Sequence, residues 1–385
     1  MTVNVTARGA ERWKQGHPWI YRSDVAEEPD KKPGIVPVTD RKGKFLGKAL
    51  YSPSSEIRLR LLTRADEPID ATWWTKRIGD AAECRAGISA SAWRAVHAEG
   101  DGLPSLIIDK YGPYIVAQLL SAGLETARAD VLTAIREVFG PEGILLRNDA
   151  GVRRHEGLPE EVVLAHGDVP KVVEVSEDGV RYLAAPWTGQ KTGAFLDQRE
   201  NRLLVTRHTK PGGRALDLFT YHGSFALHLA RQAKEVIAVD QSSEALARGA
   251  ENARLNAINN IEWREANTFD LLRELEQRRE RFDTIVLDPP AFAKTKANLE
   301  RAVAGYKEIN LRAMKILAEG GVLFTSSCSY HVSRDVFTAM LVDAAKDSGR
   351  RIQFLAATGA AGDHPELLNV PETGYLKGVL LRALA

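Results

Sequence analysis

Residues 210–385 alternate short apolar strands with amphipathic helices, and this alternation constrains the fold more than any other feature of the sequence. Strand-like segments occur at 215–219, 235–240, 282–288 and 321–327, and each is followed by a helical pattern. Repeated strand–helix units of this length are typical of a mostly parallel sheet with helices on both faces. We therefore predict an α/β, doubly wound domain in the C-terminal part of the chain.

Two further zones precede this domain. Residues 1–68 contain short strand-like segments at 34–40, 45–52 and 57–63, separated by turns, and this spacing suggests a small β-barrel. Residues 69–172 mix helical and strand patterns and indicate a central α+β domain. We place the domains at 1–68, 69–172 and 173–385, with a hairpin turning at Asp178-Gly179 near the start of the third.

Composition narrows the classes of protein. The chain has 385 residues, of which 44% are hydrophobic and 27% charged, as in ordinary globular proteins. No apolar stretch approaches the roughly 18 residues of a membrane span, and the N-terminus has no secretory signal. With only Cys84 and Cys328, we expect a soluble cytoplasmic protein with reduced thiols. Residues 1–64 carry 13 Lys/Arg against 7 Asp/Glu, which hints at a polyanionic partner.

Ligands of doubly wound sheets bind at the carboxyl ends of the strands. The first strand ends in Asp217 and Phe219, and Gly223 follows in the turn to the next helix. Asp240 ends the second strand, about twenty residues on, where a carboxylate can accept hydrogen bonds from ribose hydroxyls. The pair indicates a ligand that contains adenosine, although a tight turn and a solubilising acid would leave the same pattern.

Two later strand ends carry further polar groups. Asp288 opens the loop DPPAFAKTK (288–296), in which Pro289 and Pro290 lack amide donors and Phe292 can stack on a planar base. Cys328 follows a buried strand in the polar segment TSSCSYH (325–331). A cysteine there is either a small hydrophobic filler or a nucleophile, and the residues alone leave both readings open.

Taken together, the motifs GQKTGAFLDQRENR (189–202), LDLFTYHGSFAL, VIAVDQSSEAL, LDPPAFAK, FTSSCS and LKGVLLRAL resemble a known family. It is the bacterial 23S rRNA cytosine-C5 methyltransferases, class I enzymes that use S-adenosylmethionine. GHPWIYRSDV (16–25) is similar to the start of their N-terminal PUA domain, an RNA-binding barrel, and residues 100–123 resemble their central domain. The resemblance covers nearly the whole chain and implies a Rossmann-like catalytic domain.

The resemblance also implies roles for individual residues. Those that would hold the cofactor are Lys191, Gln198, Arg199, Asp217, Phe219, Tyr221, Gly223, Asp240, Asn267 and Asp288. Cys328 would be the nucleophile and Asp288 would contact the flipped cytosine, with Pro289, Pro290, Phe292, Lys14 and Trp19 at the RNA. Two positions depart from the family pattern: the turn reads YHGSF where relatives commonly have Thr-Gly-Gly, and Asn267 stands where an aspartate often contacts adenine.

The implied reaction is methylation of cytosine C5 through a covalent bond between Cys328 and C6, in 23S rRNA. His222, Tyr330 and His331 are candidates for the base that removes the C5 proton. We expect no metal and no membrane partner, and the sequence leaves a homodimer open. Three alternatives remain: a guanine-N2 methyltransferase that does not need Cys328, an RNA-binding protein with a degenerate enzyme domain, and a nicotinamide dehydrogenase, which the lack of a GxGxxG motif disfavours.

Overall fold

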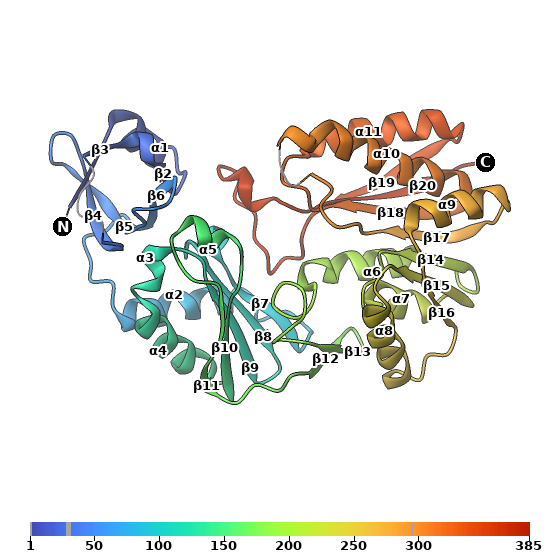
Figure 1. Cartoon of the computed structure of the whole chain (residues 1–385), viewed down its shortest axis with the longest axis horizontal. Coiled ribbons are helices and arrows are strands. Elements are labelled where there is room, and N and C mark those ends of the chain that lie inside the picture. The colour runs from blue at the N-terminus through green and yellow to red at the C-terminus, as the bar shows by residue number, and fades with distance from the viewer. Residues whose placement is uncertain (1, 28–31, 294–295) are drawn as a thin grey trace. The chain divides into compact units, whose positions relative to one another are not determined.

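The computed structural model describes residues 2–27, 32–293 and 296–385. The chain divides into two compact units, drawn in Figure 1. The first comprises residues 1–175, 184–196 and 362–373, and the second comprises 176–183, 197–361 and 374–385. Each unit is described by itself below.

The first unit contains two sheets. The six-stranded sheet has the order β2-β6-β5-β4-β1-β3, and its strands are β1 (Val3–Val5), β2 (Trp19–Tyr21), β3 (Val25–Glu27), β4 (Gly34–Asp40), β5 (Phe45–Tyr51) and β6 (Ile57–Thr63). Helix α1 (Ala7–Lys14) packs Trp13 into the core of this sheet. The three longest strands match the predicted segments at 34–40, 45–52 and 57–63, whereas the three-residue strands are too short to show a period in the sequence.

The five-stranded sheet has the order β11-β10-β9-β8-β7. Its strands are β7 (Ala92–His97), β8 (Leu106–Tyr111), β9 (Tyr114–Leu119), β10 (Gly143–Asn148) and β11 (Glu161–Gly167), with helices α2 (Ala71–Glu83), α3 (Ala122–Glu125), α4 (Arg128–Phe139) and α5 (Val152–His155). Strands β8, β9 and β10 and helix α2 follow the predicted pattern. The mixture of α and β structure predicted for this zone is confirmed.

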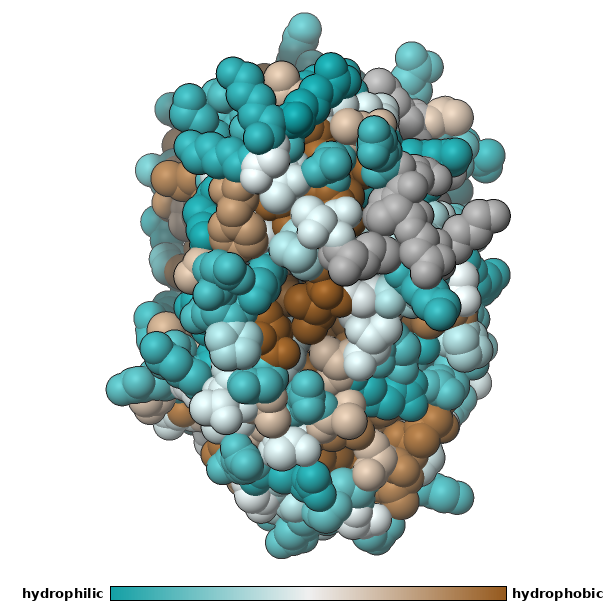
Figure 2. All heavy atoms as spheres, turned by 90° about the vertical axis from the view of Figure 1, so that its left-hand side faces the viewer, coloured by the Kyte–Doolittle hydropathy of each residue, from teal (hydrophilic) through white to brown (hydrophobic). Residues whose placement is uncertain are grey.

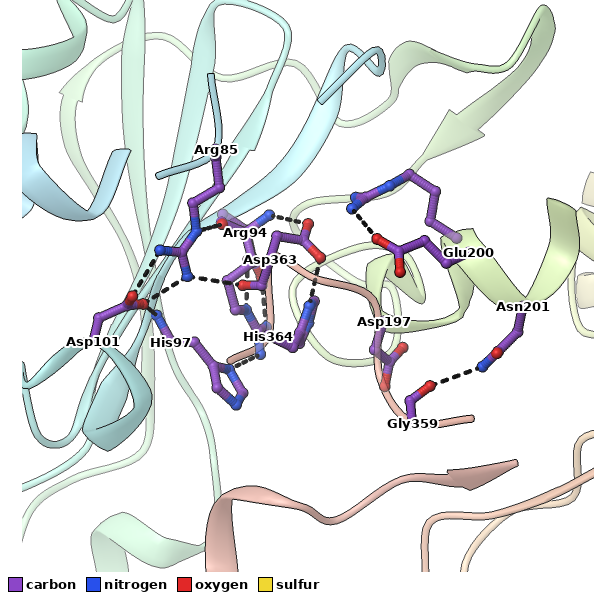
Figure 3. Close-up of polar contacts among 12 residues, drawn as sticks. Arg85, Arg94, His97, Asp101, Asp197, Glu200, Asn201, Gly359, Asp363 and His364 are labelled. Atoms are coloured by element: carbon purple, nitrogen blue, oxygen red, sulfur yellow. Dashed lines mark hydrogen bonds and ion pairs between the residues drawn. The ribbon is translucent and has the colours of Figure 1, made fainter. Parts of the chain in front are cut away.

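Residues 362–373 come from the C-terminal part of the sequence but belong to the first unit, where buried polar contacts hold them. Arg85 donates to the Asp363 carbonyl (3.0 Å) and forms a two-point ion pair with Asp101 (Figure 3). The backbone N–H of Arg94 donates to the Asp363 carboxylate (2.9 Å). No sequence pattern indicated this excursion, because its partners lie more than two hundred residues away.

The second unit is built on a seven-stranded sheet of order β16-β15-β14-β17-β18-β20-β19. Its strands are β14 (Arg214–Leu218), β15 (Glu235–Asp240), β16 (Ile261–Glu265), β17 (Phe282–Leu287), β18 (Leu317–Ser327), β19 (Ile352–Thr358) and β20 (Lys377–Ala383). The five strands from β16 to β18 run parallel, and β20 pairs antiparallel with β18 and β19. The predicted mostly parallel sheet is confirmed.

Helices cover both faces of this sheet (Figure 1). They are α6 (Arg199–His208), α7 (Ser224–Ala230), α8 (Ser243–Leu255), α9 (Thr268–Gln277), α10 (Leu299–Ile316) and α11 (Arg334–Ser348). The alternation of side chains along β15 divides the core: Val236 and Ala238 pack with α6 and α7, whereas Ile237 and Val239 pack with α9, α10 and α11. The α/β fold with helices on both faces is therefore as predicted.

Local signals set several helix starts and turns. Ser242 and Ser333 cap α8 and α11 by accepting the N–H of Ala245 and Val336. Strands β12 (Val173–Glu177) and β13 (Val180–Ala184) form the predicted hairpin, and its turn has positive φ at Asp178 (47°) and Gly179 (76°). Within the described residues, no helix has the length and hydropathy that a membrane span requires.

Candidate active site

The loop between β14 and α7 has an unusual backbone. Phe219 (φ 65°) and Tyr221 (φ 52°) both lie in the left-handed region, which side chains other than glycine rarely adopt. Such conformations persist where the surrounding contacts hold them, and they gather at functional sites. Gly223 (φ 83°) has no room for a side chain, because a Cβ would lie 2.4 Å from the Trp263 ring. Close packing against Trp263 therefore requires glycine at position 223, and the sequence alone did not reveal this reason.

Asp217 is buried at the end of β14. One carboxylate oxygen accepts hydrogen bonds from the Thr220 hydroxyl (2.5 Å) and the Ala226 N–H (2.9 Å). The other oxygen, Oδ1, is buried and has no hydrogen-bond partner among the described residues. Burial raises the pKa of Asp217 to about 7, and the charges of Asp288 and Asp240 add to this rise.

Asp240 accepts hydrogen bonds from the loop after β14 and from the loop after β15. Its Oδ2 accepts the Tyr221 N–H (2.9 Å) and its Oδ1 accepts the Ser242 N–H (3.0 Å). The carboxylate therefore holds the left-handed turn at Tyr221 in place. It also stays partly exposed at the sheet edge, as a group that receives ribose hydroxyls must be.

Asn267 caps helix α9. Its side-chain oxygen accepts the N–H groups of Phe269 (2.9 Å) and Asp270 (3.3 Å). The oxygen that we expected to accept a bond from the adenine amine is therefore already engaged. A hollow of about 340 Å³ opens beside this cap, lined by Arg264, Glu265, Ala266, Asn267, Asp270, Leu271 and Glu274. The role of Asn267 toward a cofactor stays a prediction.

Asp288, at the end of β17, is the centre of a polar network. Its Oδ1 accepts hydrogen bonds from Gln198 (2.7 Å) and from the Ser326 hydroxyl. Asn201 fixes the orientation of the Gln198 amide, since its Nδ2 donates to Gln198 Oε1 (2.6 Å) and to the Gly359 carbonyl (3.0 Å; Figure 3). The network brings together Gln198 and Asp288, two residues that the sequence placed at one site.

The Pro-Pro loop after β17 packs largely inward. Pro289 is buried and Pro290 exposed. The half-buried ring of Phe292 lies 4.6 Å from that of Tyr306 and 6.4 Å from that of Phe219. This contact joins two predicted site residues, Phe219 and Phe292, but it occupies part of the Phe292 surface that a base would need for stacking. Residues 294 and 295 of the predicted motif lie outside the described residues.

Cys328 follows β18, next to the strand that leads to Asp288. It is half-buried, and Ser326, two residues before it, donates to the Asp288 carboxylate. Parallel pairing of β17 with β18 brings both strand ends to the same sheet edge. Cys328 and Asp288 thus lie at the same edge of the sheet in the second unit, and their roles as nucleophile and carboxylate stay predictions. Cys84 is exposed at the end of α2 in the first unit.

The three candidates for a general base differ in their surroundings. His222 is buried and its ring stacks on Tyr182 at 5.6 Å. Burial lowers the pKa of His222 to about 4, so its imidazole is neutral at pH 7. Tyr330 is 60% exposed and its ring meets His331 edge-on, in the Cys328 loop. The assignment of a general base among the three stays a prediction.

Comparison with known proteins agrees with this geometry. Residues 3–64 match the family of PUA-like domains, and residues 152–382 match the family of S-adenosylmethionine-dependent methyltransferases. Proteins called ribosomal RNA large subunit methyltransferase I are 40% identical in Tolumonas auensis, with 96% of each chain covered, and 38% identical in Erwinia tasmaniensis, with 100% of each covered. The chain belongs to this methyltransferase family. Its cofactor is S-adenosylmethionine, and the resemblance found in the sequence is confirmed.

The fold of the family is also seen in solved structures. A SAM-dependent methyltransferase from Streptococcus mutans superposes with a TM-score of 0.84 at 19% identity, over 99% of this chain and 100% of that one. The SMU.776 protein, solved in complex with SAH, gives a TM-score of 0.85 at 20% identity, with the same coverage. These likenesses confirm the fold of the whole chain.

The second unit suits the cofactor of this family. Asp217, whose buried Oδ1 has no partner among the described residues, and the neighbouring Asp240 and Asp288 form an acidic sheet edge, which suits a ligand that carries a sulfonium and an ammonium group. Asp240 would hold the ribose. Asp217 and the turn at 219–223 would lie at the methionine end. When bound, S-adenosylmethionine supplies an electrophilic methyl group.

Three predicted site residues belong to the first unit. Lys191 (φ 54°) places its ammonium 4.6 Å from the centre of the Phe195 ring. Trp19 donates its indole N–H to Glu99 (2.9 Å), and Lys14 is exposed beside Glu11. Arg199, in the second unit, is buried and lies 3.6 Å from Glu200. The functional roles of these four residues stay predictions.

Sequence reasoning missed several residues that shape the site, above all Tyr306, Lys377 and Asn201. Each is buried: Tyr306 and Lys377 contact Ser329, which is distant in sequence, whereas Asn201 contacts Gln198, three residues before it. A polar residue inside an otherwise apolar helix or strand pattern is the signal that could have revealed them. Lys377 begins the apolar run KGVLLRA, where a lysine is unexpected.

Proposed function

We propose that the chain methylates C5 of a cytosine in the RNA of the large ribosomal subunit, with Cys328 as nucleophile. The observation that carries this proposal is that Cys328 and Asp288 follow adjacent parallel strands at the same sheet edge, where Ser326 donates to the Asp288 carboxylate. Relatives named for the large-subunit RNA support the choice of substrate. Such a substrate would place the reaction in the cytoplasm, and 23S rRNA is the RNA that the resemblance implies.

The chemistry explains why a thiol is needed. C5 of cytosine is a poor nucleophile until a thiolate forms a bond to C6, which moves the C5=C6 electron pair onto C5. After C5 has received the methyl group, a base removes the C5 proton. The electrons of that C–H bond restore the double bond, and the S–C6 bond breaks to return the thiolate. The Asp288 carboxyl group, held by Gln198 and Ser326, would accept a hydrogen bond from the N4 amine or, when protonated, donate to N3 as charge develops on the ring.

RNA binding is the role that we propose for the six-stranded sheet and its surroundings. Figure 2 shows the side of the molecule on which the N-terminus lies in Figure 1, and hydrophilic residues cover most of that face, with smaller apolar areas between them. Lys14 is exposed, and Arg12 lies 4.8 Å over the Tyr21 ring. Cations and aromatic rings close together on one domain suit phosphates and unpaired bases. The domain limits 1–68, 69–172 and 173–385 remain our proposal for this division of labour.

Trapping with 5-fluorocytosine tests the proposed reaction. Fluorine cannot leave C5 as a cation, so the final elimination stalls and a covalent protein–RNA adduct should survive denaturing electrophoresis. Peptide mapping should place the adduct on Cys328, and Cys328→Ala should abolish it and methylation together. Cys84→Ala is the matched control, because Cys84 is exposed in the other unit, and it should behave as the wild type.

The same experiment separates the alternatives. Methylation by Cys328→Ala at a rate near that of the wild type would refute the nucleophile, and guanine N2 would become the better target. RNA binding without methylation of any base by the wild type would instead favour an RNA-binding protein with an inactive enzyme domain. The observed family membership counts against a nicotinamide dehydrogenase.

A further inference from the structure

Ser329, the residue after Cys328, is held by five hydrogen bonds, one of them from the Val332 N–H to its carbonyl (3.1 Å). Its N–H donates to Ser327 Oγ (3.3 Å), and its own Oγ accepts the Ala293 N–H (3.2 Å) and contacts the Tyr306 hydroxyl (3.0 Å). Its carbonyl accepts a bond from Lys377 Nζ (2.7 Å). The position of the Cys328 backbone is therefore fixed from three elements: the loop after β17, helix α10 and strand β20.

Lys377 is unusual among these partners. It is only 4% exposed, and its Nζ also donates to the Tyr375 carbonyl (2.8 Å). Its Cα pairs in register with Ser327, the residue just before Cys328. Burying an ammonium group is costly, and a neutral donor would satisfy a carbonyl at lower cost. The ammonium of Lys377 would therefore have a further role if an anion, such as a thiolate, formed close to it.

We propose that Lys377 is a positioning residue that holds the Cys328 loop through Ser329 and stabilises the thiolate of Cys328 with its positive charge. This inference rests on the proposed function, because it concerns the same nucleophile. A nearby lysine favours the thiolate over the thiol, and the thiolate is the form that attacks carbon. Carbonyl dipoles at Ser329 and Tyr375 hold the ammonium at a fixed place, so little reorganisation is needed when the thiolate forms.

Other titratable groups among the described residues lie around this loop, and neither Tyr306 nor Asp288 supplies a positive charge. Burial raises the pKa of Tyr306, and negative charge at Cys328 raises it further, so the phenol stays neutral. Asp288, reached through Ser326, is an acid and opposes the thiolate. Tyr330 and His331 belong to the loop itself, and Arg334 at the start of α11 donates to the Thr358 carbonyl (2.9 Å).

Alkylation of the two cysteines measures the proposed effect directly. Full-length protein is treated with iodoacetamide from pH 5.5 to 9.5, and the rates at Cys328 and Cys84 are read separately by peptide mass spectrometry. Lys377→Met should slow alkylation of Cys328 at pH 7 about tenfold and move its pH midpoint upward by about one unit. Lys377→Arg, which keeps the charge, should stay within about threefold of the wild type.

Matched controls exclude a general effect. Lys307→Met removes a partly exposed lysine that pairs with Asp347 (2.7 Å), and it should leave the Cys328 profile unchanged. Alkylation of Cys84 should be the same in every variant. Binding of S-adenosylhomocysteine, measured by calorimetry, should stay within about twofold and shows that the second unit is folded.

The outcomes are distinct. An unchanged Cys328 profile in a folded Lys377→Met protein overturns the inference. If that variant does not fold, the wild type decides: a Cys328 midpoint at or above that of exposed Cys84 overturns it, and a lower one supports it. RNA methylation is assayed separately, so a shifted profile in an enzyme that does not methylate cytosine refutes the proposed function alone.

Discussion

Replacing Asp217 with asparagine should make the stability of the protein depend on pH in a defined way. Burial raises the pKa of Asp217 from the usual 3.8 to about 7. In the folded protein the carboxyl group therefore keeps its proton up to about pH 7, whereas in the unfolded chain it loses the proton near pH 4. A group with a raised pKa stabilises the fold fully at low pH, and this contribution is lost as the pH rises through 7.

The expected size follows from this pKa. A change of one pKa unit corresponds to 1.36 kcal/mol, so the loss between pH 4 and pH 8 is about 4 kcal/mol. Relaxation of the loop or entry of water would lower this figure. Asp217→Asn has no titrating group, so the free energy of unfolding of the variant minus that of the wild type should rise by roughly 2–4 kcal/mol over this range. Its amide nitrogen, at the place of the partner-less Oδ1, adds a cost that does not vary with pH.

Urea unfolding at pH 4.5, 6, 7 and 8 measures the difference between the two proteins, in which the other titrating groups cancel. Asp283→Asn is a control of opposite sign. Burial alone would raise the pKa of Asp283, but the Arg214 N–H (3.0 Å) and the Lys210 ammonium (3.0 Å) hold it below the usual value. Its stabilising contribution is therefore lost as the pH falls. A flat difference profile for Asp217→Asn would refute the reasoning.

Three further predictions test other parts of the structure. Asp240→Ala should weaken S-adenosylmethionine binding by roughly 1–3 kcal/mol in calorimetry, because ribose hydroxyls would lose their acceptor; unchanged affinity would remove Asp240 from the cofactor site. Glu177→Gln breaks a buried ion pair with Arg202 (2.7 Å) and should lower the free energy of unfolding by roughly 3–5 kcal/mol, as read from urea titrations. Lys14→Ala should weaken RNA binding similarly for all sequences and reduce the slope of log affinity against log salt by about 1; an unchanged slope would mean that Lys14 contacts no phosphate.

The sequence predicted those features that depend on local patterns. The repeat of apolar residues in β15 and in the helices on either side of it can be read from each segment alone. Ser242 and Ser333 mark helix starts by their residue type. Three-residue strands such as β1 carry no period, so only pairing with distant strands creates them. The antiparallel strand β20 has the same apolar composition as a parallel one, and its direction depends on how the chain returns to the sheet.

The candidate site shows the same division. Asp217, Asp240 and Asp288 stand at the ends of predicted strands, and the sequence placed them correctly at one sheet edge. The contacts that each predicted side chain makes could not be predicted, because many of its partners are distant in sequence. Asn267 serves first as a helix cap, and Phe292 packs against Tyr306, because helices and loops compete for the same side chains.

Burial of Asp217, and to a smaller extent the nearby carboxylates of Asp288 and Asp240, make its ionised form costly for the protein alone, as its raised pKa shows. A cation bound at this edge would favour the ionised form of Asp217. Binding of S-adenosylmethionine near pH 7 should therefore release part of a proton, detected as a dependence of the calorimetric heat on the ionisation enthalpy of the buffer. S-adenosylhomocysteine lacks the sulfonium charge and should release less, and Asp217→Asn should release none from this group. Equal proton release by both ligands would show that Asp217 does not sense the sulfonium, and the cost of the buried carboxylate would then need another explanation.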